Sequence, residues 1–330
     1  MTPLCHAYRP RHVALLALLG WLMCSSAGLA HEGLPLAPHD LPSAWNWDPL
    51  MLLGLALGTM VYARGLWVLW ARAGTGAGVG RWQAASFAAG VYALFVALVS
   101  PLDALSHALF SAHMAQHMVL ILVAAPLLVY GAPLLPALWA LPRQQRVAAG
   151  HWWNGAKSVR ALWRLLTQPL VVWVLFALTL WVWHLPRLYQ TAVASSAVHF
   201  LEHSSMLATA SLFWWLVIQP VGRRRLNYGG AILLVFTTSV QSTVLGALIT
   251  FAPRPLYPIY EASVSAWNLT LLKDQQLAGL IMRTPGGFIF LFAAGALFLL
   301  WLQEMERRAT PRKVKTKGKS IVGADTSRAR

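Results

Sequence analysis

The chain has 330 residues, of which 58% are apolar and 11% are charged, and its mean hydropathy is +0.56. A soluble domain carries about 25% charged residues, so this composition excludes an ordinary soluble fold. The 11% of aromatic residues and the two cysteines also exclude a disordered chain and a disulfide scaffold. The net charge of +16 raises nucleic-acid binding as an alternative, and the positions of the basic residues decide that question.

The first 30 residues have the pattern of a secretory signal peptide. Two arginines precede an apolar stretch at residues 13–23, and the sequence Ala-Gly-Leu-Ala at residues 27–30 predicts cleavage after Ala30. The alternative is an uncleaved first membrane helix, although the apolar stretch is short for a full span. Residues 31–48 are then expected to form an outer N-terminal segment.

Seven later segments are long and apolar enough to cross a membrane, and glycine or proline residues follow most of them. The sequence therefore predicts an all-α, polytopic membrane bundle at residues 49–303, with seven transmembrane helices after a cleavable signal peptide. A basic cytoplasmic tail at residues 304–330 follows the bundle. The predicted spans are residues 49–71, 82–100, 114–139, 169–184, 201–220, 229–251 and 286–303.

The basic residues gather on one side of this topology. With the mature N-terminus outside, 19 of the 26 Lys and Arg residues fall in inner segments, and nine of these belong to the tail from Arg307 to Arg330. Basic residues favour the cytoplasmic side of a membrane, so the C-terminus is expected in the cytoplasm. The tail is interpreted as a topology anchor attracted to anionic lipid, and nucleic acid is not an expected partner.

Histidines and acidic residues gather on the opposite side. Eight of the nine histidines after Ala30 and seven of the ten acidic residues fall in outer segments or at outer helix ends. Ionisable groups near membrane depth are costly, so they indicate a functional site on the outer face. The outer histidines are His31, His39, His107, His113, His117, His184, His199 and His203.

The densest outer motif is His113-Met114-Ala115-Gln116-His117-Met118, at the start of the third predicted span. A spacing of four places His113 and His117 on one helical face and Met114 and Met118 on the adjacent face. Imidazole together with thioether suits copper(I) better than zinc or magnesium. The alternative for both methionines is an apolar role, facing lipid or filling the core.

A second pair, His199 and His203, has the same spacing at the start of the fifth predicted span, with Glu202 beside it. The two pairs are expected at the same depth, where they could converge on one metal ion. The alternative is that helix-end histidines bind only backbone groups or lipid headgroups. Weaker candidates are Glu202, His107, His184 and, with its α-amine after cleavage, His31 as a copper(II) ligand.

The three outer connections of the predicted bundle resemble one another, because each starts with a proline and leads to polar residues. Similar spacing can arise by chance, so an internal repeat of three helical hairpins is a hypothesis. In the third connection Asp274 takes the place of histidine, as a hard ligand, a proton acceptor or a support for ligands. Met282 lies two turns further along as another candidate ligand, and Pro285 is expected to introduce the last span.

On several motifs in one order, the sequence resembles the membrane-embedded CtaG family of cytochrome c oxidase assembly factors. The resemblance covers residues 95–303 and implies a polytopic protein of the bacterial inner membrane that acts with cytochrome c oxidase subunits. It also implies copper handling for the buried copper site of the oxidase. The matching motifs are Ser100-Pro101-Leu102, His113 to Met118, Ala125-Pro126-Leu127-Leu128, Trp183-His184-Leu185-Pro186, His199 to His203, and Asp274 to Met282.

Two other functions fit the same residues. One is a haem-binding electron-transfer protein, in which histidines from two helices ligate one haem. The other is a metal-free scaffold whose outer histidines contact oxidase subunits. An enzyme is not expected, because the sequence has no phosphate-binding glycine loop, nucleophile elbow or H-E-x-x-H motif. A transporter would need a polar series through the middle of the helices, which the sequence lacks.

Overall fold

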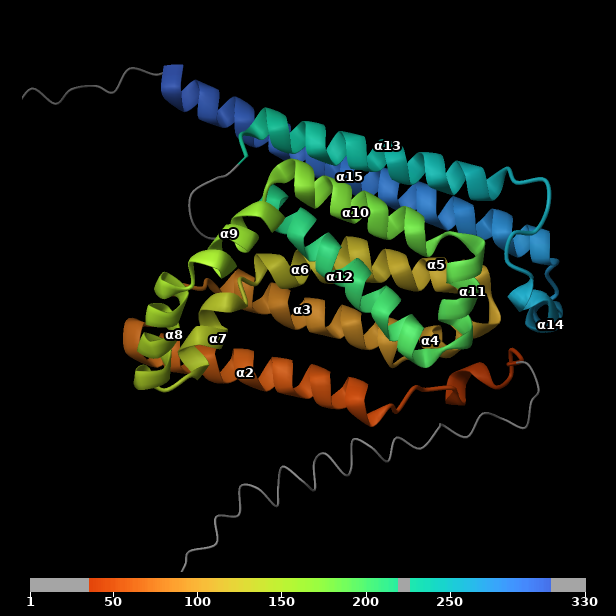
Figure 1. Cartoon of the computed structure of the whole chain (residues 1–330), viewed down its shortest axis with the longest axis horizontal. Helices are drawn as coiled ribbons and strands as arrows, with labels where there is room; N and C mark the ends of the chain where they lie inside the picture. The colour runs from red at the N-terminus through yellow and green to blue at the C-terminus, as the bar shows by residue number, and fades with distance from the viewer. Residues whose placement is uncertain (1–35, 219–225, 310–330) are drawn as a thin grey trace, which may run out of the picture.

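The computed structural model describes residues 36–218 and 226–309, and all regular elements in these two ranges are helices (Figure 1). The predicted all-α class is therefore confirmed for the described part of the chain. The predicted signal peptide, His31 and most of the basic tail lie outside the described residues.

Long helices run along the bundle, and short helices form most of its connections (Figure 1). The long elements are α2 (Pro49–Ala73), α3 (Arg81–Leu98), α5 (Phe110–Met118) with the π-helix η2 (Val119–Ala124) and α6 (Ala125–Tyr130), α10 (Pro169–Trp183), α12 (Ser196–Ile218), α13 (Tyr228–Thr250) and α15 (Leu271–Ala309). The short elements are η1 (Leu41–Ser43), α4 (Pro101–Ala108), α7 (Leu134–Ala140), α8 (Arg143–Gly155), α9 (Lys157–Leu166), α11 (Pro186–Ala194), η3 (Pro258–Tyr260), α14 (Glu261–Val264) and η4 (Ser265–Trp267).

Four helices among the described residues are long and apolar enough to cross a membrane, or up to six if each of two bent helix pairs is one span. The four are Pro49–Ala73, Phe110–Tyr130, Tyr228–Thr250 and Leu271–Arg308. The bent pairs are α3 with α4, and α9 with α10. Helix α12 covers the described part of the fifth predicted span, up to Ile218, but is not among these helices, so the count of seven stays a prediction.

Two predicted boundaries are wrong. The third span ends at Tyr130 rather than at residue 139, because Ala132 adopts a φ of 48° and breaks the helix. The last helix begins at Leu271 rather than at residue 286 and continues through Pro285. A proline inside a membrane helix is tolerated when neighbouring groups satisfy the backbone that it leaves unpaired.

A π-helical turn fixes the contact between the third span and α12. The N–H of Ala125 donates to the carbonyl of Leu120, five residues back, so the carbonyl of Ile121 stays free of that bond. The indole Nε1 of Trp214 in α12 donates to this carbonyl at 2.8 Å. This hydrogen bond sets the position of α12 along α5 and α6. It therefore also sets the position of the α12 histidines, along the bundle axis, relative to the histidines of α5.

Helices α13 and α15 lie side by side over most of their length (Figure 1). Their approach depends on glycine at the contact: a Cβ on Gly246 would lie 2.9 Å from the carbonyl oxygen of Gly279. Small residues at helix contacts let backbones pack closely inside a membrane bundle. This contact anchors the start of α15, which carries Asp274.

The bundle has two distinct ends (Figure 1). The end formed by α4, α11 and α14 is called the site end, and the end formed by α7, α8 and α9 is called the basic end. At the site end, Pro101, Pro186 and Pro258 each occupy the first position of a short helix, where proline is well tolerated. The three connections at the site end therefore share a proline that begins a short helix.

Candidate metal centre

Helix α5 is held at its first turn by Asp274 of α15. The buried Asp274 carboxylate accepts hydrogen bonds from the backbone N–H groups of Phe110 at 2.7 Å and Ser111 at 3.2 Å, and from the Ser111 hydroxyl. Unpaired N–H groups and the helix dipole both favour a carboxylate at this position. Of the three roles that the sequence left open for Asp274, this geometry favours support of the ligands.

The structure brings the two predicted histidine pairs together. Within α5 the ring centroids of His113 and His117 are 4.4 Å apart, and within α12 those of His199 and His203 are 4.1 Å apart. Between the helices, His113 lies 5.2 Å from His199 and His117 lies 5.1 Å from His203, again between ring centroids. Four imidazoles from two helices therefore share one volume.

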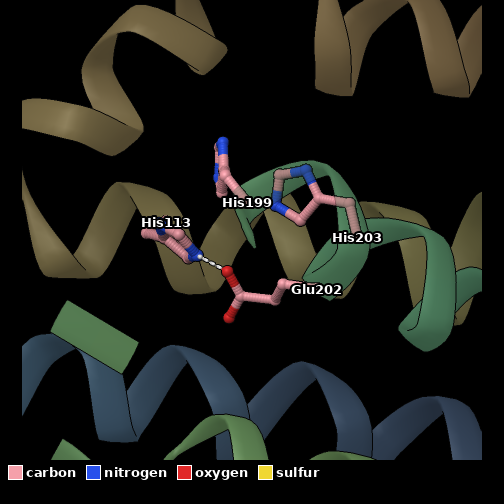
Figure 2. Close-up of side chains that lie close together, drawn as sticks. All are labelled: His113, His199, Glu202 and His203. Carbon is pink, nitrogen blue, oxygen red and sulfur yellow. Dashed lines mark ion pairs between the residues drawn. The ribbon is translucent and has the colours of Figure 1, made fainter. Parts of the chain in front are cut away.

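Glu202 of α12 enters the same volume (Figure 2). Its Oε2 lies 3.6 Å from Nε2 of His113, and its Oε1 lies 3.7 Å from Nε2 of His117. Each of His113, His199, Glu202 and His203 offers one ligand atom, and these four atoms all lie within 4.8 Å of one another. These four residues and His117 are called the histidine cluster.

The cluster contains buried polar atoms without a hydrogen-bond partner. Such atoms are rare in proteins, because burial without a partner costs free energy. A cation bound by some of these atoms would accept lone pairs that otherwise lack a partner. The residues therefore fit a metal ion. The atoms are Nδ1 of His113, Nδ1 of His117, Nε2 of His199, Nε2 of His203, and both carboxylate oxygens of Glu202.

His184 and Met114 form a softer pair of donors next to the cluster. Nδ1 of His184 lies 2.6 Å from the carbonyl oxygen of Leu180, which can only accept, so this nitrogen carries the proton. In the neutral ring Nε2 then has a free lone pair, and it lies 3.3 Å from the thioether sulfur of Met114. The rings of His184 and His117 are 6.2 Å apart.

All three candidate methionines belong to the buried apolar core, and among the described residues Met114 differs by its contact with His184. Met118 lines a small apolar space with Ile121 and Leu122, and it belongs to the buried apolar core. Met282 is fully buried in the same core. Their surroundings favour the apolar alternative that the sequence left open for Met118.

His107 lies beside the cluster, at the surface of the site end. It is exposed in the last turn of α4, and its ring centroid lies 4.9 Å from that of His199. His107 therefore lies between the buried ring of His199 and the surface of the site end.

Three buried tyrosines lie near the histidine cluster, and no sequence motif marks them as site residues. Tyr189 of α11 has its ring 5.0 Å from that of His113, and its hydroxyl lies 2.7 Å from the hydroxyl of Tyr260. Tyr257 donates to the carbonyl of His184 at 2.8 Å. Burial raises the pKa of the Tyr257 hydroxyl above its usual range, so it stays a neutral donor. Only their neighbouring prolines marked this region in the sequence.

A second polar network ties α4 to its neighbours. The buried carboxylate of Asp103 accepts from Nε2 of Gln116 in α5 and from Nδ2 of Asn46 in the segment before α2, both at 2.8 Å. Gln116 also donates to the carbonyl of Ala97 in α3 at 2.7 Å. The network therefore fixes α4, and with it His107, relative to the histidine helix α5.

A family model described as "Cytochrome c oxidase caa3 assembly factor" matches residues 60–304. Uncharacterized proteins of Mycobacterium bovis and Mycobacterium tuberculosis are 29% identical over 273 residues, which cover 81% of this chain and 41% of each relative. An uncharacterized protein of Mycobacterium leprae is 28% identical over 286 residues, or 84% of this chain and 42% of the relative. The chain thus spans less than half the length of these relatives, and no solved structure matches it. By the family match, the chain belongs to the cytochrome c oxidase caa3 assembly factors.

Proposed function

We propose that this protein binds a copper ion in the histidine cluster and passes it on during maturation of the oxidase copper site. The observation that supports this most strongly is the buried group of His113, His199, Glu202 and His203, with its ligand atoms within 4.8 Å of one another. The ion is cargo, and the protein catalyses no reaction in this proposal.

The donor set supports a transition metal. Imidazole nitrogens suit copper, zinc, iron and nickel, whereas calcium and magnesium prefer a shell of oxygen ligands. The carboxylate of Glu202 supplies a negative charge that offsets the cost of burying a cation. Both features favour an ion held away from water, as a carrier of a reactive metal requires.

The pair of Met114 and His184 supports copper(I) within this group of metals. A thioether is a soft ligand that favours copper(I) over zinc, and its sulfur lies 3.3 Å from a nitrogen lone pair. The main cluster is richer in imidazole than the sequence motif alone suggested, so it also accommodates copper(II). Copper can therefore be held beside the soft pair in either oxidation state.

The proposed location is the bacterial inner membrane, with the site end outside and the basic end in the cytoplasm. The support is the exposed Lys157 and Arg164 on α9, together with the basic residues of α8, at the basic end. Such residues favour the cytoplasmic face. A copper ion would then be received and delivered on the outer side, where the proposed partners are oxidase subunits.

The packing gives less support to the alternatives. A haem needs space for its ring between two axial imidazoles, but Nε2 of His113 lies 3.0 Å from Nε2 of His117, and α12 closes on both. A metal-free scaffold would need histidines that reach a partner, yet no cluster histidine is more than 8% exposed.

The test is the copper content of the detergent-purified full-length protein. We expect bound copper in the wild type and in His151→Ala, a control at an exposed histidine of the basic end. We expect His113→Ala/His117→Ala to lose its copper, and cells that carry it to lose oxidase activity. Unchanged copper content in this double variant would contradict the proposal.

Two further measurements identify the alternatives. A Soret band in the reduced-minus-oxidised spectrum would favour haem binding. Wild-type protein without bound metal, combined with full oxidase activity in the double variant, would favour the scaffold.

A further inference from the structure

We propose that His107 is the ligand through which a metal ion exchanges between solvent and the buried histidine cluster. The inference rests on the proposed copper binding and adds a role for a residue outside the four-residue group. His107 is exposed at the end of α4, and its ring lies 4.9 Å from that of His199.

The imidazoles form a series of increasing burial. His107 is exposed, His199 and His203 retain 8% and 7% exposure, and His117 and His113 retain 1% and 0%. Ring centroids along the route from His107 to His199 to His113 are 4.9 Å and 5.2 Å apart. Each ring therefore lies close enough to the next for one ion to contact both during a step.

A bare ion is strongly disfavoured in this environment. Removing a cation from water into an apolar interior is costly unless ligands replace the water. An ion that enters or leaves the cluster must therefore keep at least one protein ligand until solvent reaches it. Among the histidines in contact with the cluster, His107 is the exposed one, so it supplies this ligand at the surface.

The position of His107 is fixed by its own helix. Asp103, one turn earlier in α4, is bound by Gln116 and by Asn46. The carbonyl of Ser106, next to His107, accepts from the hydroxyl of Tyr260 at 3.1 Å. Helix α4 is therefore held on both sides, and His107 stays beside His199 rather than moving with a loose loop.

The experiment measures the rate of copper(I) release from the loaded, full-length protein to an excess of a coloured copper(I) chelator. We expect His107→Ala to keep the copper stoichiometry of the wild type. Its rates of copper release and loading should fall to about one tenth of the wild-type rates, or lower. His107→Met keeps a copper donor and should restore the rate. His39→Ala is the matched control, since His39 is exposed but pairs with Asp40 outside the cluster.

Each of the other possible results contradicts the exchange role of His107, copper binding, or both. Wild-type release rates in His107→Ala overturn the exchange role and leave copper binding standing. Loss of copper from His107→Ala makes His107 a permanent ligand, and failure of His107→Met to restore the rate makes the effect structural. A wild type without copper overturns both proposals.

Discussion

The two ends of the bundle connect helices in opposite ways. At the site end, the connecting segments place Tyr189, Tyr257 and Tyr260 inside the protein, where their hydroxyl groups are hydrogen-bonded. At the basic end, α8 and α9 contain no buried residue. The site-end connections are therefore part of the core, whereas α8 and α9 at the basic end lie on its outside.

The exposed helix α9 shows what the basic end is suited for. Its charged residues Lys157 and Arg164 and its apolar residues Leu162 and Leu165 are exposed. Basic and apolar side chains on one short helix are typical of a membrane–water interface. We therefore expect substitutions at the site end to change copper binding and stability, and substitutions of exposed residues in α8 and α9 to change neither.

The largest effect is expected for Asp274→Asn. The amide can accept hydrogen bonds through one oxygen only, so the first turn of α5 loses part of its charged cap. We expect the free energy of unfolding to fall by about 3 kcal/mol and the copper content to fall with it. Thermal unfolding in detergent and metal analysis measure these changes.

The control for this variant is Glu304→Gln at the basic end, which breaks an exposed ion pair with Arg308. Such a pair contributes about 0.5 kcal/mol or less. Equal destabilisation by the two substitutions would remove the distinction between the ends.

The next largest effect, on copper affinity, is expected for Glu202→Gln. Loss of the negative charge should weaken copper binding at least about tenfold. The metal-free protein should become no less stable, because a buried carboxylate without a partner is itself unfavourable. Competition titration and unfolding measure the two quantities. The control is Glu261→Gln, at an exposed carboxylate of α14, which should leave copper affinity and stability unchanged. Unaltered copper affinity in Glu202→Gln would contradict a ligand role for Glu202.

A smaller effect is expected for Trp214→Phe, which keeps an aromatic but smaller ring and removes the donor to the Ile121 carbonyl. We expect a loss of about 1 kcal/mol in unfolding free energy, since one buried carbonyl loses its partner. Copper affinity should fall slightly as α12 loses its fixed position along α5. A variant as stable as the wild type would show that apolar packing alone holds this contact.

The smallest effect is expected for Lys157→Gln/Arg164→Gln on α9. Both side chains are exposed, so unfolding free energy should change by less than about 0.5 kcal/mol. Copper content should equal that of the wild type. A marked loss of copper would show that the basic end influences the histidine cluster.

Hydropathy and histidine spacing were sufficient to predict the helical class and the two converging pairs. Hydropathy failed where polar residues lie inside a helix. Gln275 is buried in α15, where its side chain accepts from Leu256 N at 2.6 Å and donates to the carbonyl of Ile249 at 3.2 Å. These partners are distant in sequence and leave no local pattern. Hydropathy therefore predicts the start of the last helix too late in the chain.

The roles of individual site residues were harder to predict. Asp274 has the chemistry of a ligand, and only its hydrogen bonds to Phe110 and Ser111 show that it caps α5. Met114 and Met118 are equivalent in the motif, yet only Met114 lies against His184. The side that each methionine faces depends on packing between helices, which sequence spacing does not contain.

The π-helical turn at residues 119–124 contains one residue more than an α-helical turn would need. The presence of this residue and that of the tryptophan at position 214 depend on each other. Deletion of one residue there would let the segment close as an ordinary α-helix and rotate α5 against α6 by about 100°. The carbonyl now bound by Trp214 would then be used within the helix, and the indole N–H would lose its acceptor. Among related proteins, we therefore expect this extra residue and the tryptophan to be gained and lost together.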